Sequence, residues 1–532
     1  MNLGGYRLGI DVGGTNTDAV LMSGKEVIAT AKNFTTTDIR GGLVRVVEKI
    51  FDQSSVKASE LDAVMIGTTQ FVNAFVQRRQ LAEVAVFRVC LPKSDGVPPL
   101  AGWPDDLIEV IGSHVYLVGG GAHHTGHDYA PLDEAALRKA ATHAKKAGLR
   151  AVAISATFGP IRPDIEERAR DIVKSIIPDA RITISSSVGG IGLVDRENAA
   201  IVNSSLVDLS SEVIQSLEKA FLDLGISAPL FISQNDGTLI TTEVAAALPI
   251  LTCSAGPTNS IRGAAFLTGL QEAVVADIGG TTTDIGFLLR GFPRETTAPS
   301  VVGGVRTNFR MPDVLSIGLG GGSLVHVTDG ACRVGPQSVG FRLQDEGLAF
   351  GGRVLTATDI AIRAGQARIG DVSHLQGLSP QLVESALDDI HRQVEEAIDQ
   401  VKTNSKPIPL VLVGGGSVLI SRNIKGASEV HRPNHSEVAN AVGAAIALVS
   451  GRIDKLYDVS VEGREATLER AKAEAANAAI AAGAASDEVE IVEVTELPMT
   501  HMRSGAVQIR VRAVGPLRMG GVKTSKREGA LC

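Results

Sequence analysis

The sequence has few aromatic residues, no long apolar run and no excess of basic charge. Aromatic residues make up 4% of the 532 residues, and one of them is a tryptophan. No apolar stretch approaches the roughly 20 residues that a membrane-spanning helix needs, so no membrane association is expected. The N-terminus leads directly into the apolar segment Tyr6–Ile10, without the pattern of a secretory signal. The net charge of -8 offers no basic surface for nucleic acid or anionic lipid.

Cysteine is also scarce. The four cysteines, Cys90, Cys253, Cys332 and Cys532, are far apart and show no paired spacing. This pattern favours reduced thiols in the cytoplasm over a disulfide framework. Cys253 could act as a nucleophile, although a buried apolar cysteine is the commoner case.

Glycine, in contrast, is abundant, with 58 residues. One glycine-rich stretch occurs twice: Asp11–Asp18 is DVGGTNTD and Asp277–Asp284 is DIGGTTTD, with six of eight positions identical. Apolar runs flank both copies, which predicts a strand, a glycine turn and a second strand at each. The repeat predicts two similar lobes with a phosphate site between them.

A chain of this length is too long for one simple core. We expect an α/β fold with two ribonuclease-H-like lobes, the first over residues 1–265 with insertions and the second over 266–450. Residues 451–532 are expected to form a small C-terminal α+β segment that ends in a disordered tail. Apolar spacing predicts helices over 380–403 and 438–450.

The glycine turns predict an anion site, because consecutive glycines let backbone N–H groups converge on one point. Asp11 and Asp277 end the strands that precede the turns. Since a carboxylate repels phosphate, we expect each to hold Mg²⁺ through water, with the cation bridging to phosphate. The residues predicted to bind phosphate are Gly13, Gly14, Thr15, Asn16, Thr17, Gly279, Gly280, Thr281, Thr282 and Thr283.

A third glycine cluster follows the apolar run 410–413 and consists of Gly414, Gly415 and Gly416. Its bare backbone is expected to lie against an adenosine. One glycine turn alone is weak evidence, because many hairpins need glycine. The two turns followed by this cluster, in this order, predict a single ATP site.

These elements together resemble the actin, hexokinase and Hsp70 superfamily of ATPases, in which the hairpins are called phosphate 1 and phosphate 2. The chain is similar, more narrowly, to the hydantoinase A/5-oxoprolinase family over roughly residues 6–450. The stretches that carry this resemblance are Leu8–Met22, Gln234–Leu239, Ser254–Pro257, Val275–Phe287, Ile317–Ser323, Val334–Ser338, Thr356–Asp359 and Val438–Ala445.

The resemblance implies ATP- and Mg²⁺-dependent opening of a cyclic amide or imide, with phosphorylation of the ring carbonyl oxygen before hydrolysis. It implies catalytic roles for Asp11 and Asp277 and nucleotide contacts for Gly320 and Gly321. It also implies a homo- or hetero-oligomer with a B-type subunit. Acetone and acetophenone carboxylases are relatives, so a carboxylase subunit is an alternative. A small-molecule kinase and a non-enzymatic ATP-driven switch are further alternatives.

The substrate stays open, because two segments depart from the family pattern. Ser254–Pro257 is SAGP, one residue longer than the usual SGPA, and Arg162–Glu166 lacks the usual histidine. Asp236 follows an apolar strand and is expected to take a catalytic role at substrate or Mg²⁺ in the cleft.

Two further groups carry alternatives. A cluster of three histidines suits a Zn²⁺ site, a polar loop of the substrate cleft or a plain solvated loop; it consists of His123, His124 and His127. Acidic residues at the start of a predicted helix suit ordinary capping. The resemblance instead suggests Arg196, Glu197 and Asn203 as cleft residues.

Overall fold

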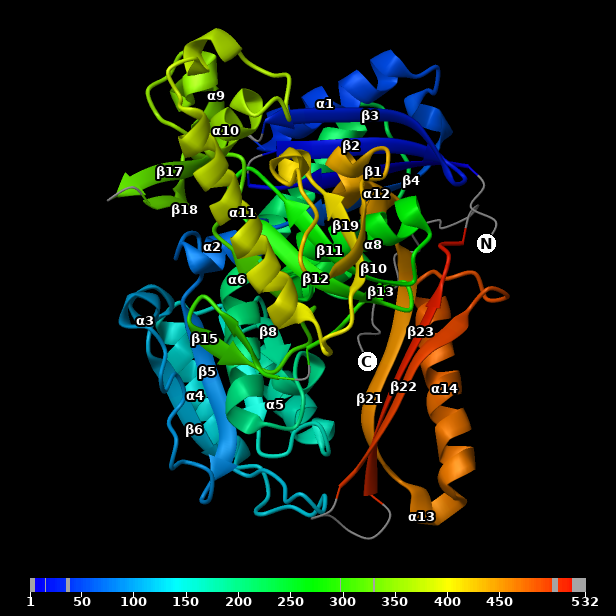
Figure 1. Cartoon of the computed structure of the whole chain (residues 1–532). Coiled ribbons are helices and arrows are strands. Elements are labelled where there is room, and N and C mark those ends of the chain that lie inside the picture. The colour runs from blue at the N-terminus through cyan, green and yellow to red at the C-terminus, as the bar shows by residue number, and fades with distance from the viewer. Residues whose placement is uncertain are drawn as a thin grey trace.

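The structure is a computed structural model that describes residues 5–14, 16–34, 39–296, 298–328, 331–499 and 506–518. Two sheets form its centre, and a parallel insertion and the C-terminal strands extend from the first of them (Figure 1). Thr15 and the tail predicted to be disordered lie outside the described residues. Within those ranges, no helix is both long and apolar enough to cross a membrane.

The first lobe is built on a nine-stranded sheet in the order β22-β23-β21-β10-β9-β4-β1-β2-β3. β2 pairs antiparallel with β1 and β3, whereas β4 pairs parallel with β1 and β9. This is the predicted ribonuclease-H-like arrangement. Its strands are β1 (Tyr6–Val12), β2 (Asn16–Ser23), β3 (Glu26–Phe34), β4 (Leu61–Thr68) and β9 (Leu230–Ser233).

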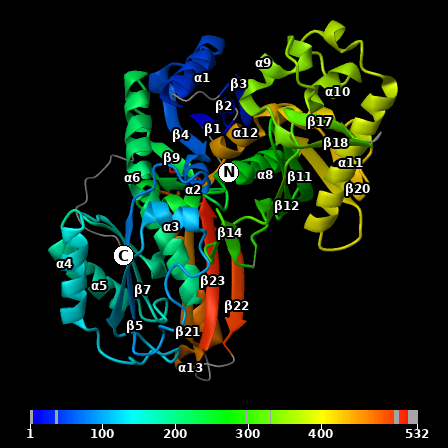
Figure 2. The ribbon, with the colours of Figure 1, turned by 90° about the vertical axis from the view of Figure 1, so that its left-hand side faces the viewer.

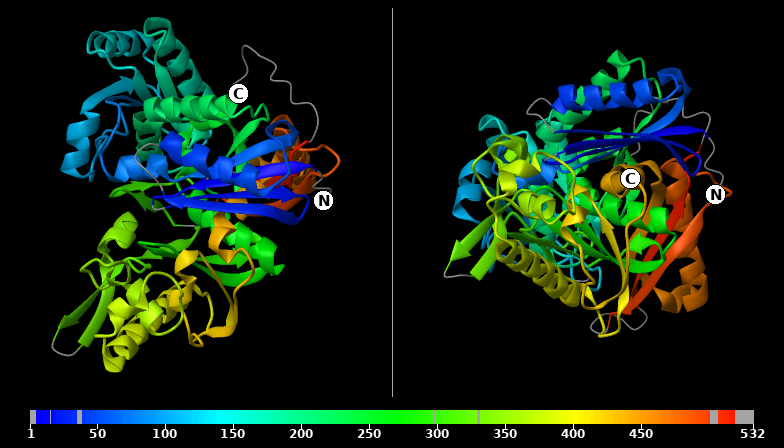
Figure 3. Two further views of the ribbon diagram at one scale, coloured as in Figure 1. Left: turned by 90° about the horizontal axis from the view of Figure 1, so that it is seen from above. Right: turned by 45° about the horizontal axis from the view of Figure 1, so that its top comes forward.

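The second lobe repeats the arrangement with the strand order β13-β12-β11-β19-β20, and β16 also pairs with β12. The left view of Figure 3 shows the blue first-lobe strands next to the green and yellow second lobe. The strands are β11 (Glu272–Ile278), β12 (Thr283–Leu289), β13 (Phe292–Pro293), β16 (Val314–Ile317), β19 (Ile408–Val413) and β20 (Ala427–His431).

An insertion between β4 and the long helix α6 (Leu193–Asp223) forms its own parallel sheet, in the order β6-β5-β7-β8. Figure 2 shows it below the first lobe, next to the C-terminal strands. Its elements are β5 (Val84–Leu91), β6 (His114–Gly119), α4 (Glu134–Lys146), β7 (Ala151–Ala156), α5 (Pro163–Ile176) and β8 (Arg181–Ile184).

The C-terminal strands continue the first-lobe sheet. β21 (Leu448–Asp458) pairs parallel with β10 (Thr238–Thr241) and antiparallel with β23 (Ala506–Gly515), and β22 (Glu490–Pro498) forms the edge. These residues therefore do not form a unit separate from the first lobe.

The helix predicted over 438–450 is wrong in its second half, because α12 ends at Ala445 and β21 begins at Leu448. The apolar run continues from helix into strand, so spacing alone could not locate the change. The reason is tertiary, because Leu448 and Val449 pair with β10 and the rest of β21 pairs with β23. Gly451 in β21 lies so close to the helix α14 (Arg464–Ala481) that a Cβ there would be 2.1 Å from the Ala479 nitrogen.

The helix predicted over 380–403 is confirmed as α11 (Pro380–Val401). Ser379 caps its first turn by accepting a hydrogen bond from the Leu382 N–H at 3.2 Å. Its apolar residues recur at intervals of three and four and pack into the core of the second lobe. They are Val383, Ala386, Leu387, Ile390, Val394, Ala397, Ile398 and Val401.

Two helices cross between the lobes. A Cβ at Gly263 would lie 1.9 Å from the Ala439 carbonyl oxygen, and one at Gly443 would lie 1.9 Å from that of Asn259. Only glycine permits this approach. The crossing helices, which place their polar residues at the hairpins, are α8 (Ala255–Thr268) and α12 (Ala439–Ala445).

Candidate active site between two aspartate hairpins

The two hairpins carry aspartates in the same register. Asp11 lies opposite Asp18 across β1 and β2, and Asp277 lies opposite Asp284 across β11 and β12. The first pair is buried and the second half-buried. Sequence reasoning assigned roles to Asp11 and Asp277 and missed their partners. The recurrence of an aspartate at the last position of the repeat was the signal.

The four carboxylates form one electrostatic cluster. Burial raises the pKa of Asp11 to about 7, with repulsion from Asp18 and Asp277 adding to the effect. Burial likewise raises the pKa of Asp284 to about 6, although a hydrogen bond from Ser316 opposes the rise. Asp277 acts on both of these aspartates, so the hairpins are coupled across the lobes. A cation placed among them would stabilise the charged forms.

The carboxylate of Asp11 and the amide of Asn259 lie together within this cluster. Both are buried, and the Asn259 amide opposes the rise in the pKa of Asp11. A Cβ at Gly67 would lie 2.3 Å from Asp11 Oδ1 and 2.4 Å from Asn259 Nδ2, so these atoms border one space. A buried carboxylate oxygen is costly unless it is well partnered, and Mg²⁺ prefers oxygen ligands and bound water. The residues present therefore fit a hydrated Mg²⁺.

Two glycines leave room for the aspartates. A Cβ at Gly67 or at Gly414 would lie 2.3 Å from Oδ1 of Asp11 or Asp277, respectively. Gly414 also adopts a φ of 82°, which favours glycine. The contact that the structure gives Gly414 is thus with an aspartate; its predicted contact with adenosine stays a prediction, as do those of Gly415 and Gly416.

The loop that contains Gly320 and Gly321 packs behind the second hairpin. The Gly321 N–H donates to the Gly279 carbonyl at 3.0 Å. The Gly322 N–H donates to the next hairpin carbonyl at 2.7 Å, and the Gly320 N–H donates to a serine hydroxyl of the same loop. Because these N–H groups are already engaged, the loop holds the hairpin in shape rather than offering amides to a phosphate.

Some of the predicted phosphate-binding groups close the turns. The Gly13 N–H donates to the Asn16 carbonyl at 3.0 Å, and the Gly279 N–H donates to the Thr282 carbonyl at 2.9 Å. The Thr283 hydroxyl is buried and donates to the Leu319 carbonyl at 2.6 Å, just before Gly320. Among the turn residues that the structure describes, the exposed ones are Gly14, Thr281 and Thr282. These exposed residues are the ones positioned to meet a ligand.

Asn440 of α12 links the two aspartates of the first hairpin. Its Nδ2 donates to Asp11 Oδ2 at 3.0 Å and to Asp18 Oδ2 at 2.9 Å. Sequence reasoning did not single out this residue, although it lies within the Val438–Ala445 stretch that carried the family resemblance. The amide fixes the orientation of Asp11, so that Oδ1 faces the space beside Gly67.

Asp236 lies in a different cluster. Its carboxylate pairs with Arg452 at 2.7 Å and Arg512 at 3.7 Å and accepts a hydrogen bond from the Thr238 hydroxyl at 2.6 Å. Burial alone would raise the pKa of Asp236, but the two arginines lower it. These contacts join Asp236 to the C-terminal strands rather than to the hairpin aspartates.

The arginine cluster lines a cavity of about 1160 Å³ between the first lobe, the insertion, the C-terminal strands and residues 289–311 of the second lobe. Asn235 forms part of its wall and accepts a hydrogen bond from the Ser254 N–H at 2.7 Å. Ser254 precedes α8, and the first turns of α8 carry Asn259 and Ser260, which lie at the carboxylates. The cavity and the carboxylate cluster therefore approach the same end of α8.

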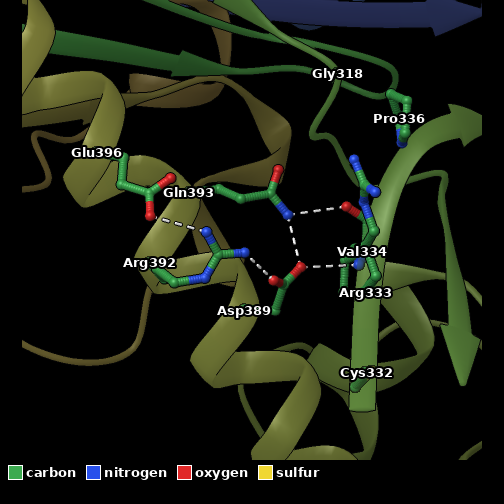
Figure 4. Close-up of a pocket in the computed structure, with 9 residues that line it drawn as sticks. All are labelled: Gly318, Cys332, Arg333, Val334, Pro336, Asp389, Arg392, Gln393 and Glu396. Carbon is green, nitrogen blue, oxygen red and sulfur yellow. Dashed lines mark hydrogen bonds and ion pairs between the residues drawn. The ribbon is translucent and has the colours of Figure 1, made fainter. Parts of the chain in front are cut away.

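A smaller cavity of about 530 Å³ lies in the second lobe between β18 (Ala331–Ser338) and α11. Figure 4 shows Asp389 beside it, accepting hydrogen bonds from the Val334 N–H at 2.9 Å and from Gln393 Nε2 at 2.7 Å. Arg392 pairs with the same carboxylate. The polar groups thus hold β18 against α11.

The structure does not gather the three histidines into a metal site. Among the described residues, no group of three His, Cys, Asp or Glu side chains is placed to hold a metal ion. The His123 ring packs edge-on against Tyr129, with centroids 3.9 Å apart, and Arg162 pairs with Asp128 at 2.8 Å. This geometry favours the two loop alternatives over the Zn²⁺ site.

The start of α6 is bound to the protein interior. Arg196 Nε donates to the Ser185 hydroxyl at 2.8 Å, and Arg88 Nε donates to Glu197 at 2.8 Å. Asn203 is buried and donates a hydrogen bond to Thr183 in the same region. These residues join α6 to the insertion, which argues against the cleft role that the resemblance suggested.

Cys253 is buried, and burial raises the pKa of its thiol to about 12. The thiol therefore stays protonated at neutral pH. A protonated thiol is a poor nucleophile, which supports the alternative of a buried structural cysteine.

Two equivalent hairpins that face each other across crossed helices define an actin-like ATPase fold. Solved structures share it. The ATP-dependent caprolactamase from Pseudomonas jessenii matches with a TM-score of 0.73 and 19% identity, over 99% of this chain and 90% of that chain. A nucleotide-free acetone carboxylase matches with a TM-score of 0.68 and 18% identity, over 98% and 90% of the two chains.

Sequence models of protein families identify the family within this fold class. The model of the hydantoinase/oxoprolinase N-terminal region matches residues 7–177, and the hydantoinase/oxoprolinase model matches residues 196–370. The chain belongs to the hydantoinase/oxoprolinase family.

Curated relatives match part of their length. Caprolactamase subunit alpha of Pseudomonas jessenii is 27% identical over 74% of this chain and 59% of its own length. The acetophenone carboxylase gamma subunit of Aromatoleum aromaticum is 26% identical over 67% of this chain and 52% of its own length. The chain thus aligns with less than two thirds of either relative.

Proposed function

We propose that this chain is the A-type subunit of an ATP-dependent hydrolase that opens a cyclic amide or imide. The observation that carries the proposal is the coupled cluster of Asp11, Asp18, Asp277 and Asp284 between the lobes. The similarity to a caprolactamase subunit supports a lactam-like substrate.

Asp11 and Asp277 hold hydrated Mg²⁺ in this proposal, and Asn440 keeps Asp11 oriented toward it. Mg²⁺ supplies positive charge that offsets the charge of the phosphates. The exposed turn residues Gly14 and Thr281 provide backbone N–H groups to the phosphates. Closure of the lobes excludes water during transfer of the phosphoryl group.

The cyclic amide binds in the cavity beside Asn235, at the end of α8. The γ-phosphoryl group leaves ADP and bonds to the ring carbonyl oxygen. A first water adds to the activated carbon and the ring C–N bond breaks, which leaves an acyl phosphate. A second water attacks the same carbon, and phosphate leaves with the original carbonyl oxygen. Asp236 and its arginines form the charged wall of this cavity.

We also propose a B-type partner subunit and a cytoplasmic setting. The relatives are named as subunits alpha and gamma, which supports a multi-chain enzyme. The cysteines Cys90, Cys253 and Cys332 are free thiols, as is usual in a reducing compartment.

The test is an isotope-transfer experiment with caprolactam, 5-oxoproline or hydantoin labelled with ¹⁸O at the carbonyl. The protein, alone and with a B-type subunit, is incubated with the labelled compound, ATP and Mg²⁺. The proposal predicts ring-opened acid and one ¹⁸O in each released phosphate.

Other outcomes separate the alternatives. A stable phosphorylated product would favour a kinase, and turnover that requires bicarbonate and a ketone would favour a carboxylase subunit. No nucleotide binding and no turnover with any cyclic amide would overturn the proposal.

A further inference from the structure

In each lobe, a further strand pairs with the second strand of the hairpin: β3 in the first lobe and β16 in the second. This strand places one residue opposite the second aspartate of the hairpin. In the second lobe it is Ser316, whose hydroxyl donates to Asp284. In the first lobe it is Lys32, whose Nζ lies 3.1 Å from Asp18 Oδ1. Because the second hairpin folds with a neutral serine at this position, the architecture does not require a lysine.

The Lys32 side chain reaches from the first lobe to the second. Its Nζ donates to the Glu437 carbonyl at 3.0 Å and lies 3.9 Å from the position of a Cβ at Gly415. Gly415 belongs to the cluster predicted to lie against the nucleotide. The ammonium group therefore stands between the first hairpin and the glycine cluster of the second lobe.

Lys32 is also accessible. Its side chain is 35% exposed, whereas that of Asp18 is 5% exposed. A lysine ammonium has three N–H donors, and the contacts with Asp18 and Glu437 engage two of them. The remaining donor can serve an anion that enters the space between the lobes.

We propose that Lys32 binds the polyphosphate of the nucleotide from the first lobe, beside the glycine cluster of the second lobe. Lysine acts as a point charge toward phosphate, without a fixed geometry. The charge of Lys32 also lowers the pKa of Asp277, against the effect of burial, so the ammonium group acts on both hairpins. This inference rests on the proposed ATP site and adds a residue to it.

The experiment is calorimetric titration of the full chain with adenosine, AMP and ADP in the presence of Mg²⁺. Lys32→Met should weaken ADP binding at least about tenfold, as expected for loss of a hydrogen bond to a charged group. The affinity for AMP should fall less, and the affinity for adenosine should not change. Lys32→Arg should restore most of the affinity.

Lys49→Met is the matched control. Lys49 Nζ contacts the Lys32 carbonyl at 3.4 Å and Asn33 Oδ1 at 3.3 Å, so this lysine contacts the strand that carries Lys32. Its removal should leave all three affinities unchanged. Lys32→Gln, which keeps polar contacts but lacks the charge, replaces Lys32→Met if the latter does not fold.

Equal losses for adenosine and ADP would show a structural role for Lys32 and overturn the inference. Unchanged ADP affinity in Lys32→Met would overturn it while leaving the ATP site intact. Failure of the wild-type chain to bind ADP and ATP would instead overturn the proposed function, and the inference with it.

Discussion

The two hairpins place aspartates at equivalent positions but surround them differently. Asp11 and Asp18 share the amide of Asn440, and Asp18 also faces the ammonium of Lys32. Asp277 and Asp284 instead receive the hydroxyls of two serines. Paired aspartates therefore recur in both lobes, whereas the direct contacts with an amide and an ammonium group are made in the first. We interpret this difference between equivalent hairpins as a consequence of function rather than of folding.

The largest expected effect tests whether the two hairpins act together. Asp11→Asn or Asp277→Asn should each lower ATP turnover at least about a hundredfold, because each removes charge that holds Mg²⁺. The rate of phosphate release in the presence of a cyclic amide measures ATP turnover. Asp171→Asn, at an exposed aspartate of the insertion, is the control and should keep full activity. A normal rate in either hairpin variant would mean that one hairpin suffices.

The paired glycines provide the next test. Gly67→Ala and Gly414→Ala should each cost about 1–3 kcal/mol of unfolding free energy, because Cβ would overlap an aspartate. Gly414→Ala should cost more, since its φ of 82° adds strain. Denaturant unfolding of the nucleotide-free protein measures both.

Two open positions serve as controls for the glycine series. A Cβ at Gly377 would have no neighbouring atom within 4 Å, and Gly148 is equally open but has a φ of 78°. Gly377→Ala should be nearly neutral, and Gly148→Ala should show strain alone. If Gly67→Ala behaved like Gly377→Ala, the space beside Asp11 would not be restricted.

A pH experiment sharpens the contrast through Asp11. Its folded-state pKa of about 7 lies above the usual aspartate value of 3.8, so the folded protein binds this proton more tightly than the unfolded chain. Stability from this group is present at low pH and is lost as pH rises from about 4 to about 7. Asp11→Asn should therefore stabilise the metal-free protein at pH 8.

Thermal melting of both proteins between pH 5 and pH 8 measures this difference. The gap between Asp11→Asn and the wild type should be larger at pH 8 than at pH 5, where Asp11 is protonated. A gap that does not change with pH would show that Asp11 does not titrate in this range.

The smallest effect concerns the neutral partner of the second hairpin. Ser316→Ala should cost about 1 kcal/mol or less, because it removes one hydrogen bond to Asp284. Ser211→Ala, which removes a hydroxyl bonded to a helix carbonyl, is a comparison in α6. If Ser316→Ala lost as much ADP affinity as is expected for Lys32→Met, the two hairpins would not differ in function.

The local pattern of the sequence is enough to predict both hairpins and the two-lobed fold. It is not enough for the partners of the aspartates, because Asn440 and Asp11 meet only through the crossing of α8 and α12. The sequence pattern places Gly67 at the end of a strand. It does not predict the neighbouring carboxylate of Asp11, which is distant in the sequence. The start of β21 is predicted as helix, because its first residues extend the apolar run of α12. Local periodicity does not account for such tertiary contacts.

Calorimetric titration of Mg²⁺-ADP into the wild type, Asp11→Asn and Asp277→Asn tests most directly whether the two hairpins make one nucleotide site. The wild type should bind one nucleotide per chain, and either substitution should weaken that single site. Two nucleotides per chain, or unchanged affinity in either variant, would contradict a shared site.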